Sequence, residues 1–154
     1  MVVTNYVDAG RSDQHRNIGE GELQRMKLKF RAYDKQTDTV RGVLVIDWLN
    51  GVVDLDGGII EREFDDVVLM QSTGLKDVNG VEIFEGDIVQ GTQTLSNSIP
   101  HSFAGMVRYD ESHARFNIAD LEGAYDITAL GETVYLLEII GNIYENPELL
   151  EVAK

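Results

Sequence analysis

Cysteine is absent from this chain of 154 residues, and it holds only two prolines and one tryptophan. Without cysteine the protein can build neither a disulfide framework nor a thiolate metal site, and this is compatible with a reducing compartment. No apolar run approaches the roughly 20 residues that a membrane-spanning helix needs. The N-terminus also lacks the basic and apolar parts of a secretory signal peptide. We therefore expect a soluble protein of the cytoplasm that does not contact membranes.

Basic side chains are scarce as well, with 13 Lys and Arg against 27 Asp and Glu, so that the formal net charge is −14. Such a surface repels phosphate backbones, and nucleic-acid binding normally depends on a basic patch. Direct binding of DNA or RNA is therefore disfavoured. The one basic strip places Lys27, Lys29 and Arg31 at alternating positions with Lys35 nearby. We interpret this strip as the solvated face of a strand.

The sequence contains no recognisable catalytic or metal-binding motif. His15, His101 and His113 are too widely spaced for a helical zinc site. The segment from Asp54 to Glu61 fails the calcium-loop template, and no Gly-Lys-Ser/Thr follows Gly57-Gly58 to make a phosphate loop. No Gly-x-Ser-x-Gly is present. We predict no catalytic residues, no cofactor and no metal. We interpret one acidic cluster as a solvated face in preference to a weak divalent-cation site: Glu61, Glu63, Asp65 and Asp66.

The stretch from Met70 to Gln90 is the most informative part of the sequence. It contains three signals for a change of chain direction, at Gly74, at Asn79-Gly80 and at Gly86-Asp87. Glycine adopts positive φ without steric cost, and Asn-Gly is the strongest short-range hairpin signal. The apolar runs between these signals are too short for a helix. This stretch therefore predicts short antiparallel strands folded back on one another.

The corner Glu85-Gly86-Asp87 is interpreted as architectural rather than as a ligand site. Gly86 permits a sharp bend, and the Asp87 carboxylate can accept hydrogen bonds from nearby backbone N–H groups. Ile88 or Val89 would then enter the core.

The rest of the patterned sequence also reads as short strands. Asn50-Gly51 is a second hairpin signal, and Gly91 to Ser102 reads as a loop. The run from Val134 to Ile140 is the most apolar and predicts a central strand that ends at Gly141. A short C-terminal helix follows, with Asn146 as N-cap and Pro147 at its first position. The prediction is a mainly β fold, a small SH3-like barrel or curled antiparallel sheet with a short C-terminal helix.

Residues 1–25 are polar, mixed in charge and without apolar periodicity, and we expect a disordered or loosely attached arm. Two explanations stay open. The arm is a true extension that docks on a neighbouring subunit, or translation starts at Met26. The second is motivated by Gly19 to Glu22, whose codons can spell a purine-rich ribosome-binding site upstream of Met26. The predicted domain spans residues 26–154.

Three separated segments resemble the YopX family of small proteins encoded by bacteriophages and prophages. They are Met26 to Asp34, Met70 to Val89 and Glu138 to Leu149, in the same order as in the family. The resemblance implies a mostly β fold with an SH3-like barrel portion built around the Gly-Asp corner, and it implies oligomer formation. It implies no activity, because the family is defined without one. It also favours the Met26 start.

We expect a non-enzymatic phage or prophage accessory protein in the cytoplasm of a bacterial host. It would act as a homo-oligomeric binding or scaffold module with a host or phage protein as partner. An alternative, motivated by the charge, is an acidic DNA mimic that occupies a host DNA-binding protein. An enzyme with a carboxylate pair in a cleft is a third reading. The residues expected to define the structural motif are Gly74, Asn79, Gly80, Glu85, Gly86, Asp87, Gly141, Asn142 and Pro147.

Overall fold

The computed structural model describes residues 28–93, 101–123, 126–130 and 134–151. The predicted arm and the Met26 start lie outside the described residues. The elements in chain order are β1 (Phe30–Asp34), β2 (Thr39–Asp47), β3 (Val52–Leu55), β4 (Ile60–Glu63), the 3₁₀ turn η1 (Phe64–Asp66), β5 (Val67–Lys76), β6 (Glu82–Phe84), β7 (Asp87–Gln93), β8 (His101–Asp110), β9 (Arg115–Ala119), β10 (Asp126–Ala129), β11 (Val134–Asn142) and α1 (Glu148–Glu151).

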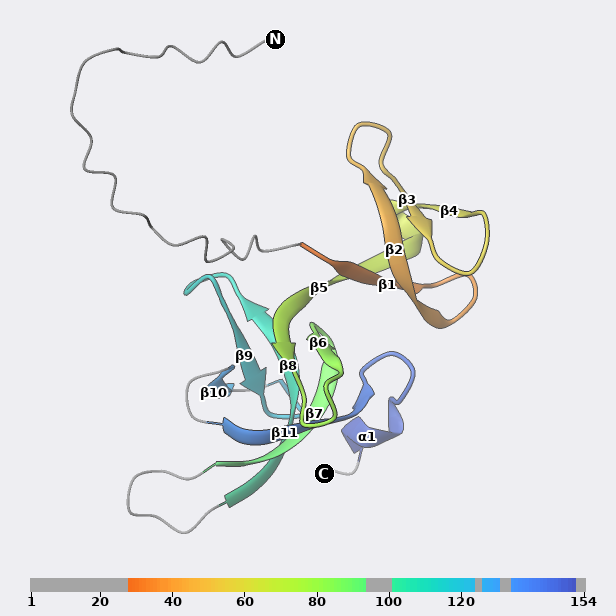
Figure 1. The fold of residues 1–154 in the computed structure, drawn as a ribbon. Helices are drawn as coiled ribbons and strands as arrows, with labels where there is room; N and C mark the ends of the chain where they lie inside the picture. The colour runs from red at the N-terminus through yellow and green to blue at the C-terminus, as the bar shows by residue number, and fades with distance from the viewer. Residues whose placement is uncertain (1–27, 94–100, 124–125, 131–133, 152–154) are drawn as a thin grey trace, which may run out of the picture.

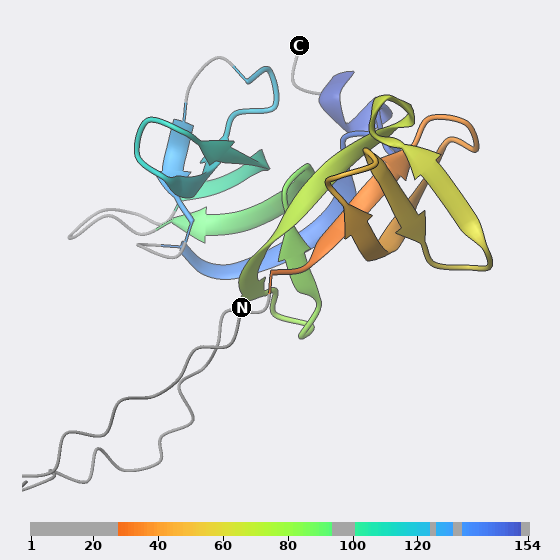
Figure 2. The same cartoon turned by 90° about the horizontal axis from the view of Figure 1, so that it is seen from above.

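The strands form two antiparallel sheets, which confirms the prediction of a mainly β fold with one short C-terminal helix. The first sheet has the order β4-β3-β2-β1-β5-β6 and the second the order β10-β9-β8-β7-β11. The sheets lie side by side, and β5 runs from the first toward the second (Figures 1 and 2). Within the described residues both sheets are open and no closed barrel forms. The SH3-like barrel therefore stays a prediction.

The fold has two small apolar cores, one within the first sheet and one between β6 and the second sheet. The first core is made by Ala32, Val53, Leu55 and Val67, which are nearly inaccessible to solvent. Alternation along β1 and β3 places these side chains on one face, as a half-buried strand requires. The second core consists of residues from β6 to β9: Ile83, Val89, Val107 and Ile118.

Close packing of the second sheet depends on a glycine in β8. A Cβ at Gly105 would press against the Ala119 carbonyl oxygen and lie 2.6 Å from Ile118 Cγ2. The backbone cannot move aside without breaking the pairing of β8 with β9. We expect Gly105→Ala to lower the free energy of unfolding by about 3 kcal/mol, because overpacking of a dense core distorts its surroundings. Urea unfolding followed by circular dichroism measures it.

The matched control is Gly42→Ala in β2, which also lacks a positive φ. Its Cβ would meet the Asp56 carboxylate at 2.7 Å. That carboxylate is the end of a flexible side chain, so a loss of about 1 kcal/mol or less is expected. Equal losses for the two variants would contradict the packing argument.

Two sequence predictions fail in the second sheet. The loop predicted from Gly91 to Ser102 is wrong at both ends, since β7 runs to Gln93 and β8 begins at His101. The strand predicted to be central is β11, which lies at the edge of its sheet and runs through Gly141.

The turn between β5 and β6 explains how an apolar strand can lie at an edge. The Val78 N–H donates to the Leu137 carbonyl at 2.9 Å, and the Ile139 N–H donates to the Asp77 carboxylate at 3.3 Å. This turn therefore covers the middle of the outer edge of β11, where a further strand would otherwise pair.

Candidate functional site at the junction of the two sheets

The centre of the junction is the backbone of Gly86. Its φ is +80°, and a Cβ would lie 3.1 Å from the Met70 sulfur. The Gly86 N–H donates to the Val107 carbonyl at 2.8 Å, and the Gly86 carbonyl accepts from the Ile143 N–H at 2.9 Å. The corner therefore connects β8 with the segment that follows β11, and it needs a residue that adopts positive φ freely.

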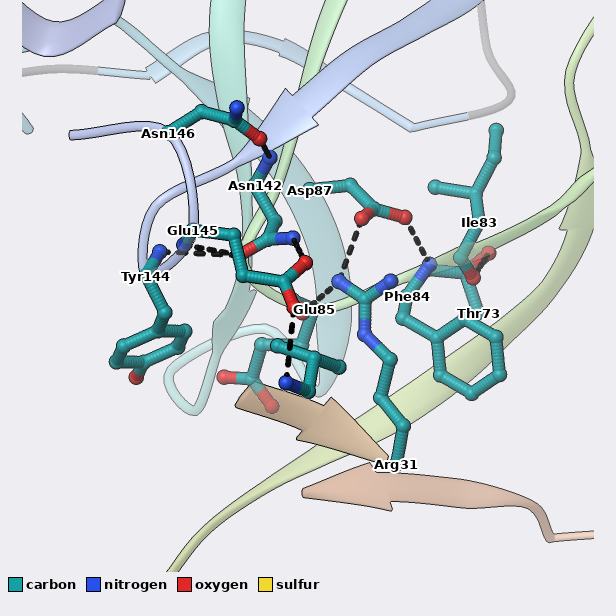
Figure 3. Close-up of polar contacts among 11 residues, drawn as sticks. Arg31, Thr73, Ile83, Phe84, Glu85, Asp87, Asn142, Tyr144, Glu145 and Asn146 are labelled. Atoms are coloured by element: carbon teal, nitrogen blue, oxygen red, sulfur yellow. Dashed lines mark hydrogen bonds and ion pairs between the residues drawn. The ribbon is translucent and has the colours of Figure 1, made fainter. Parts of the chain in front are cut away.

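The Asp87 carboxylate next to this corner is buried and paired. Only 1% of its side chain is exposed, and one oxygen accepts from the Arg31 guanidinium at 2.5 Å. The other oxygen accepts from the Phe84 N–H at 2.8 Å (Figure 3). Burial raises the pKa of Asp87, while the positive charge of Arg31 and the Phe84 N–H act against that rise.

The Arg31 side chain extends from β1 toward the second sheet, and its guanidinium contacts both an aromatic ring and a backbone carbonyl. It lies over the Phe84 ring, 4.9 Å from the ring centroid, and donates to the Glu85 carbonyl at 3.4 Å (Figure 3). Its side chain is only 17% exposed. The interpretation of Arg31 as part of a solvated strand face is therefore wrong. The local sequence pattern could not show this, because the partner Asp87 lies 56 residues further along the chain.

The loop after β11 makes the second connection between the sheets. The Asn142 side-chain oxygen accepts from the N–H groups of Tyr144 at 3.0 Å and Glu145 at 2.9 Å. The Asn142 side-chain amide in turn donates to the Glu145 carboxylate at 2.8 Å (Figure 3). That carboxylate accepts from the Val40 N–H of β2 at 3.0 Å. Asn142 thus shapes a loop that holds Glu145 against the first sheet.

Two tyrosines stack across the same junction. The rings of Tyr33 in β1 and Tyr144 are nearly parallel, with centroids 4.5 Å apart. The hydroxyl of Tyr33 donates to the Asp38 carboxylate at 2.6 Å and is held in place by it. This hydrogen bond to a carboxylate raises the pKa of Tyr33. The stacked pair adds apolar contact to the polar connections on either side.

The start of α1 differs from the prediction. The side-chain oxygen of Asn146 accepts from the Asn142 N–H at 3.2 Å instead of capping the helix (Figure 3). The helix begins at Glu148, one residue after the exposed Pro147. Gly141 has no room for a side chain, since a Cβ would lie 2.6 Å from the Asn146 oxygen and 2.8 Å from Leu149 Cδ1.

The fold brings five of the nine predicted motif residues to this junction: Glu85, Gly86, Asp87, Gly141 and Asn142. Three others belong to the β5–β6 hairpin. Gly74, with φ +77°, lies inside β5 at an irregularity of the pairing with β6 and not in a turn. Asn79 and Gly80 lie in the turn itself.

Asp77, which the sequence did not single out, holds that turn. Its carboxylate accepts from the N–H groups of Asn79 and Val81, both at 2.8 Å, as well as from Ile139. Burial works to raise the pKa of Asp77, but these backbone hydrogen bonds outweigh burial and lower it. The available signal was an Asp two residues before Asn-Gly, which is the arrangement of an Asx turn.

Most polar groups of the junction hydrogen-bond to one another, whereas the buried Nε of Arg31 has no hydrogen-bond partner among the described residues. Among the described residues no group of three or more His, Cys, Asp or Glu side chains could hold a metal ion. The contacts that join the two sheets here are the Arg31–Asp87 pair, the hydrogen bond from Val40 to Glu145 and the stacked tyrosines.

Two exposed apolar surfaces in the described part of the chain border cavities. The first, here called the β2 patch, borders an open cavity of about 460 Å³ that is lined by residues of β1 and β2 and by Phe84 of the junction. The second, called the turn patch, lies where the β5–β6 turn meets β11, beside a cavity of about 410 Å³. The β2 patch consists of Leu28, Leu44, Val45, Trp48 and Leu49, and the turn patch of Leu75, Val78, Val81 and Leu136.

None of the helices within the described ranges combines the length and the apolar character that crossing a membrane requires.

Known proteins are similar to this chain in sequence and in structure. The family model described as YopX protein matches residues 29–151. The SPbeta prophage-derived uncharacterized protein YopX of Bacillus subtilis (strain 168) is 33% identical over 78 residues, 50% of this chain and 56% of that protein. The match thus spans little more than half the length of that relative.

A solved structure extends the comparison over most of the fold. The crystal structure of protein EF1440 from Enterococcus faecalis is similar with a TM-score of 0.51 and 29% sequence identity. It covers 80% of this chain and 97% of its own chain. The segments that match include both sheets and the corner between them, and the chain belongs to the YopX family.

Proposed function

We propose that this protein is a non-enzymatic phage or prophage accessory protein that works as a homo-oligomeric binding or scaffold module. The observation that carries the proposal is the β2 patch. It exposes five large apolar side chains, among them Leu44 at 65% and Trp48 at 70%, in a highly charged protein. Leu28 and Leu44 line the same cavity, and exposed apolar side chains next to a cavity are typical of a protein–protein contact.

The charge distribution favours the β2 patch as the surface where copies meet. Residues 77–154 hold 14 acidic and three basic side chains, whereas residues 1–76 hold 13 acidic and ten basic ones. Copies of so acidic a chain repel each other most through the second half. The β2 patch belongs to the nearly balanced first half, so association there meets the least repulsion.

The test compares Leu44→Glu with Val78→Glu by size-exclusion chromatography with light scattering. Both side chains are more than half exposed, so neither change should unfold the protein. We expect an oligomer for the wild type at micromolar concentration, dissociation to monomer for Leu44→Glu, and no change for Val78→Glu. A wild-type protein that is a clean monomer would contradict the proposal.

We also propose that the second sheet corresponds to an SH3-like barrel. The coverage of the β11 edge by the β5–β6 turn supports this, since a backbone hydrogen bond from Val78 to Leu137 joins the last hairpin of the first sheet to the edge strand of the second.

A second candidate function is an acidic DNA mimic directed at a host DNA-binding protein. The excess of carboxylates in residues 77–154 favours it, with the exposed Glu145, Glu148 and Glu151 following one another at three-residue spacing. Charge-driven binding weakens with ionic strength. In a pull-down from host lysate, the amount of host protein captured should therefore fall as the salt concentration is raised. Capture that does not depend on salt would count against the DNA mimic.

A further inference from the structure

The hairpin between β2 and β3 presents two large apolar side chains to solvent on a rigid support. Trp48 is 70% and Leu49 is 93% exposed. The Asp47 carboxylate accepts from the N–H groups of Leu49 at 2.9 Å and Asn50 at 3.0 Å, and from the Asn50 side-chain amide at 2.6 Å. The Trp48 ring contacts the edge of Phe64, with centroids 5.3 Å apart. Little conformational entropy is therefore left to lose when a partner binds this tip.

The cavity of the β2 patch lies on the same strand and has complementary properties. Its volume of about 460 Å³ is within the range of pockets that enclose organic groups. Most of its lining is apolar, and Lys29 is its one charged residue. The lining is formed by Leu28, Lys29, Phe30, Gly42, Val43, Leu44, Ile46 and Phe84.

The charges around the tip are of the opposite sign. Asp47 ends β2, and Glu63 pairs with Val52 directly after the hairpin. The Phe64 N–H donates to the Gly51 carbonyl at 2.9 Å, which brings the exposed Asp65 close to the same turn. An aromatic tip flanked by carboxylates fits an apolar cavity with the ammonium group of Lys29, which is 56% exposed and uses one of its three N–H donors for Glu82.

We propose that the occupant of this cavity is the Trp48-Leu49 tip of a second copy of the chain. Leu44, in the cavity wall, and Trp48 are four residues apart, about 13 Å along an extended strand. A two-fold axis beside β2 would therefore bring each tip to the cavity of the other copy, giving a self-complementary dimer contact. This inference rests on the proposed oligomer and names the residues of its contact.

The chain offers a direct probe, because Trp48 is its only tryptophan. The experiment records tryptophan emission and light scattering of the full-length protein over the same dilution series. We expect the emission maximum at shorter wavelength in the oligomer, with a shift to longer wavelength that follows dissociation on dilution. Iodide should quench the emission of the monomer several-fold more than that of the oligomer.

Two variants test the two sides of the contact. Leu49→Ser removes an apolar group from the tip, and Leu44→Glu places a charge in the cavity. Each should weaken association at least tenfold while the circular dichroism spectrum stays that of the wild type. Val78→Glu, in the turn patch, is the control and should associate as the wild type does.

The outcomes separate this inference from the proposed function. An oligomer whose Trp48 emission and quenching do not change with concentration would overturn the inference and leave the oligomeric function standing. So would a dimer that Leu49→Ser leaves intact, whereas a dimer that Leu44→Glu leaves intact would also overturn the β2 patch as the surface where copies meet. A protein that scatters as a monomer at every concentration would overturn both.

Discussion

Replacing Arg31 by methionine is expected to lower the free energy of unfolding by about 3–5 kcal/mol. The change leaves the Asp87 carboxylate, which is 1% exposed, without its counter-charge. It also removes the guanidinium from the Phe84 ring and from the Glu85 carbonyl. The remaining partner of that carboxylate is the Phe84 N–H. Urea unfolding, followed by both circular dichroism and Trp48 fluorescence, measures the loss.

Lys29→Met is the matched control, because it removes a cation from the same strand region. Lys29 pairs with Glu82 at 2.8 Å, but its side chain is 56% exposed. Such exposed pairs contribute about 0–1 kcal/mol. The double variant Arg31→Met/Asp87→Leu should recover part of the stability, since no buried charge is then left alone. A loss below about 1 kcal/mol for Arg31→Met would show that the junction does not depend on this pair.

Asp34→Ala is expected to cost about 3–5 kcal/mol in the first sheet. The Asp34 side chain is fully buried, and both of its oxygens accept from the Arg62 guanidinium at 3.0 and 3.1 Å. It also accepts from the Gln36 N–H at 3.0 Å and the Thr37 hydroxyl at 2.9 Å. Truncation would leave the Arg62 guanidinium, whose side chain is only 18% exposed, without its counter-charge and would remove the acceptor of the other two donors.

The pKa of Asp34 also predicts how the free energy of unfolding depends on pH. Burial acts to raise the pKa of Asp34, but the hydrogen bonds from Arg62, Thr37 and Gln36 outweigh it and lower the pKa. A carboxylate with a lowered pKa contributes stability that is fully present above its unfolded pKa of about 3.9 and is lost as the pH falls through its folded pKa. Asp87, with its raised pKa, contributes with the opposite sign.

Asp34→Asn separates the contribution of Asp34 from that of Asp87, because it removes the titrating carboxyl group of Asp34 and leaves Asp87 unchanged. Urea midpoints measured from pH 7 to about pH 3 should fall more steeply for the wild type than for the variant at the acid end. The variant should be the less stable protein at pH 7. Parallel pH curves would show that Asp34 is not a source of the acid sensitivity.

Local features of the sequence were enough for the fold class. Hairpin signals such as Asn50-Gly51 and alternating runs such as that of β1 act over a few residues, through backbone sterics and side-chain direction. The structure has turns and strands at these places. The strand of Val134 to Ile140 was also visible, but its place at an edge was not, because the β5–β6 turn that covers it lies some 60 residues away.

By itself, the sequence determined that this is a mainly β protein of the YopX family, since apolar periodicity, glycine positions and separated motifs can be read along one dimension. Only the tertiary structure decided that Arg31 and Asp34 each belong to a buried ion pair. Arg31 pairs with Asp87, 56 residues away, and Asp34 with Arg62, 28 residues away. The physical reason is that a charged side chain has the same local pattern whether it faces water or a distant counter-charge. Topology alone brings the two charges within hydrogen-bond distance and removes the water between them.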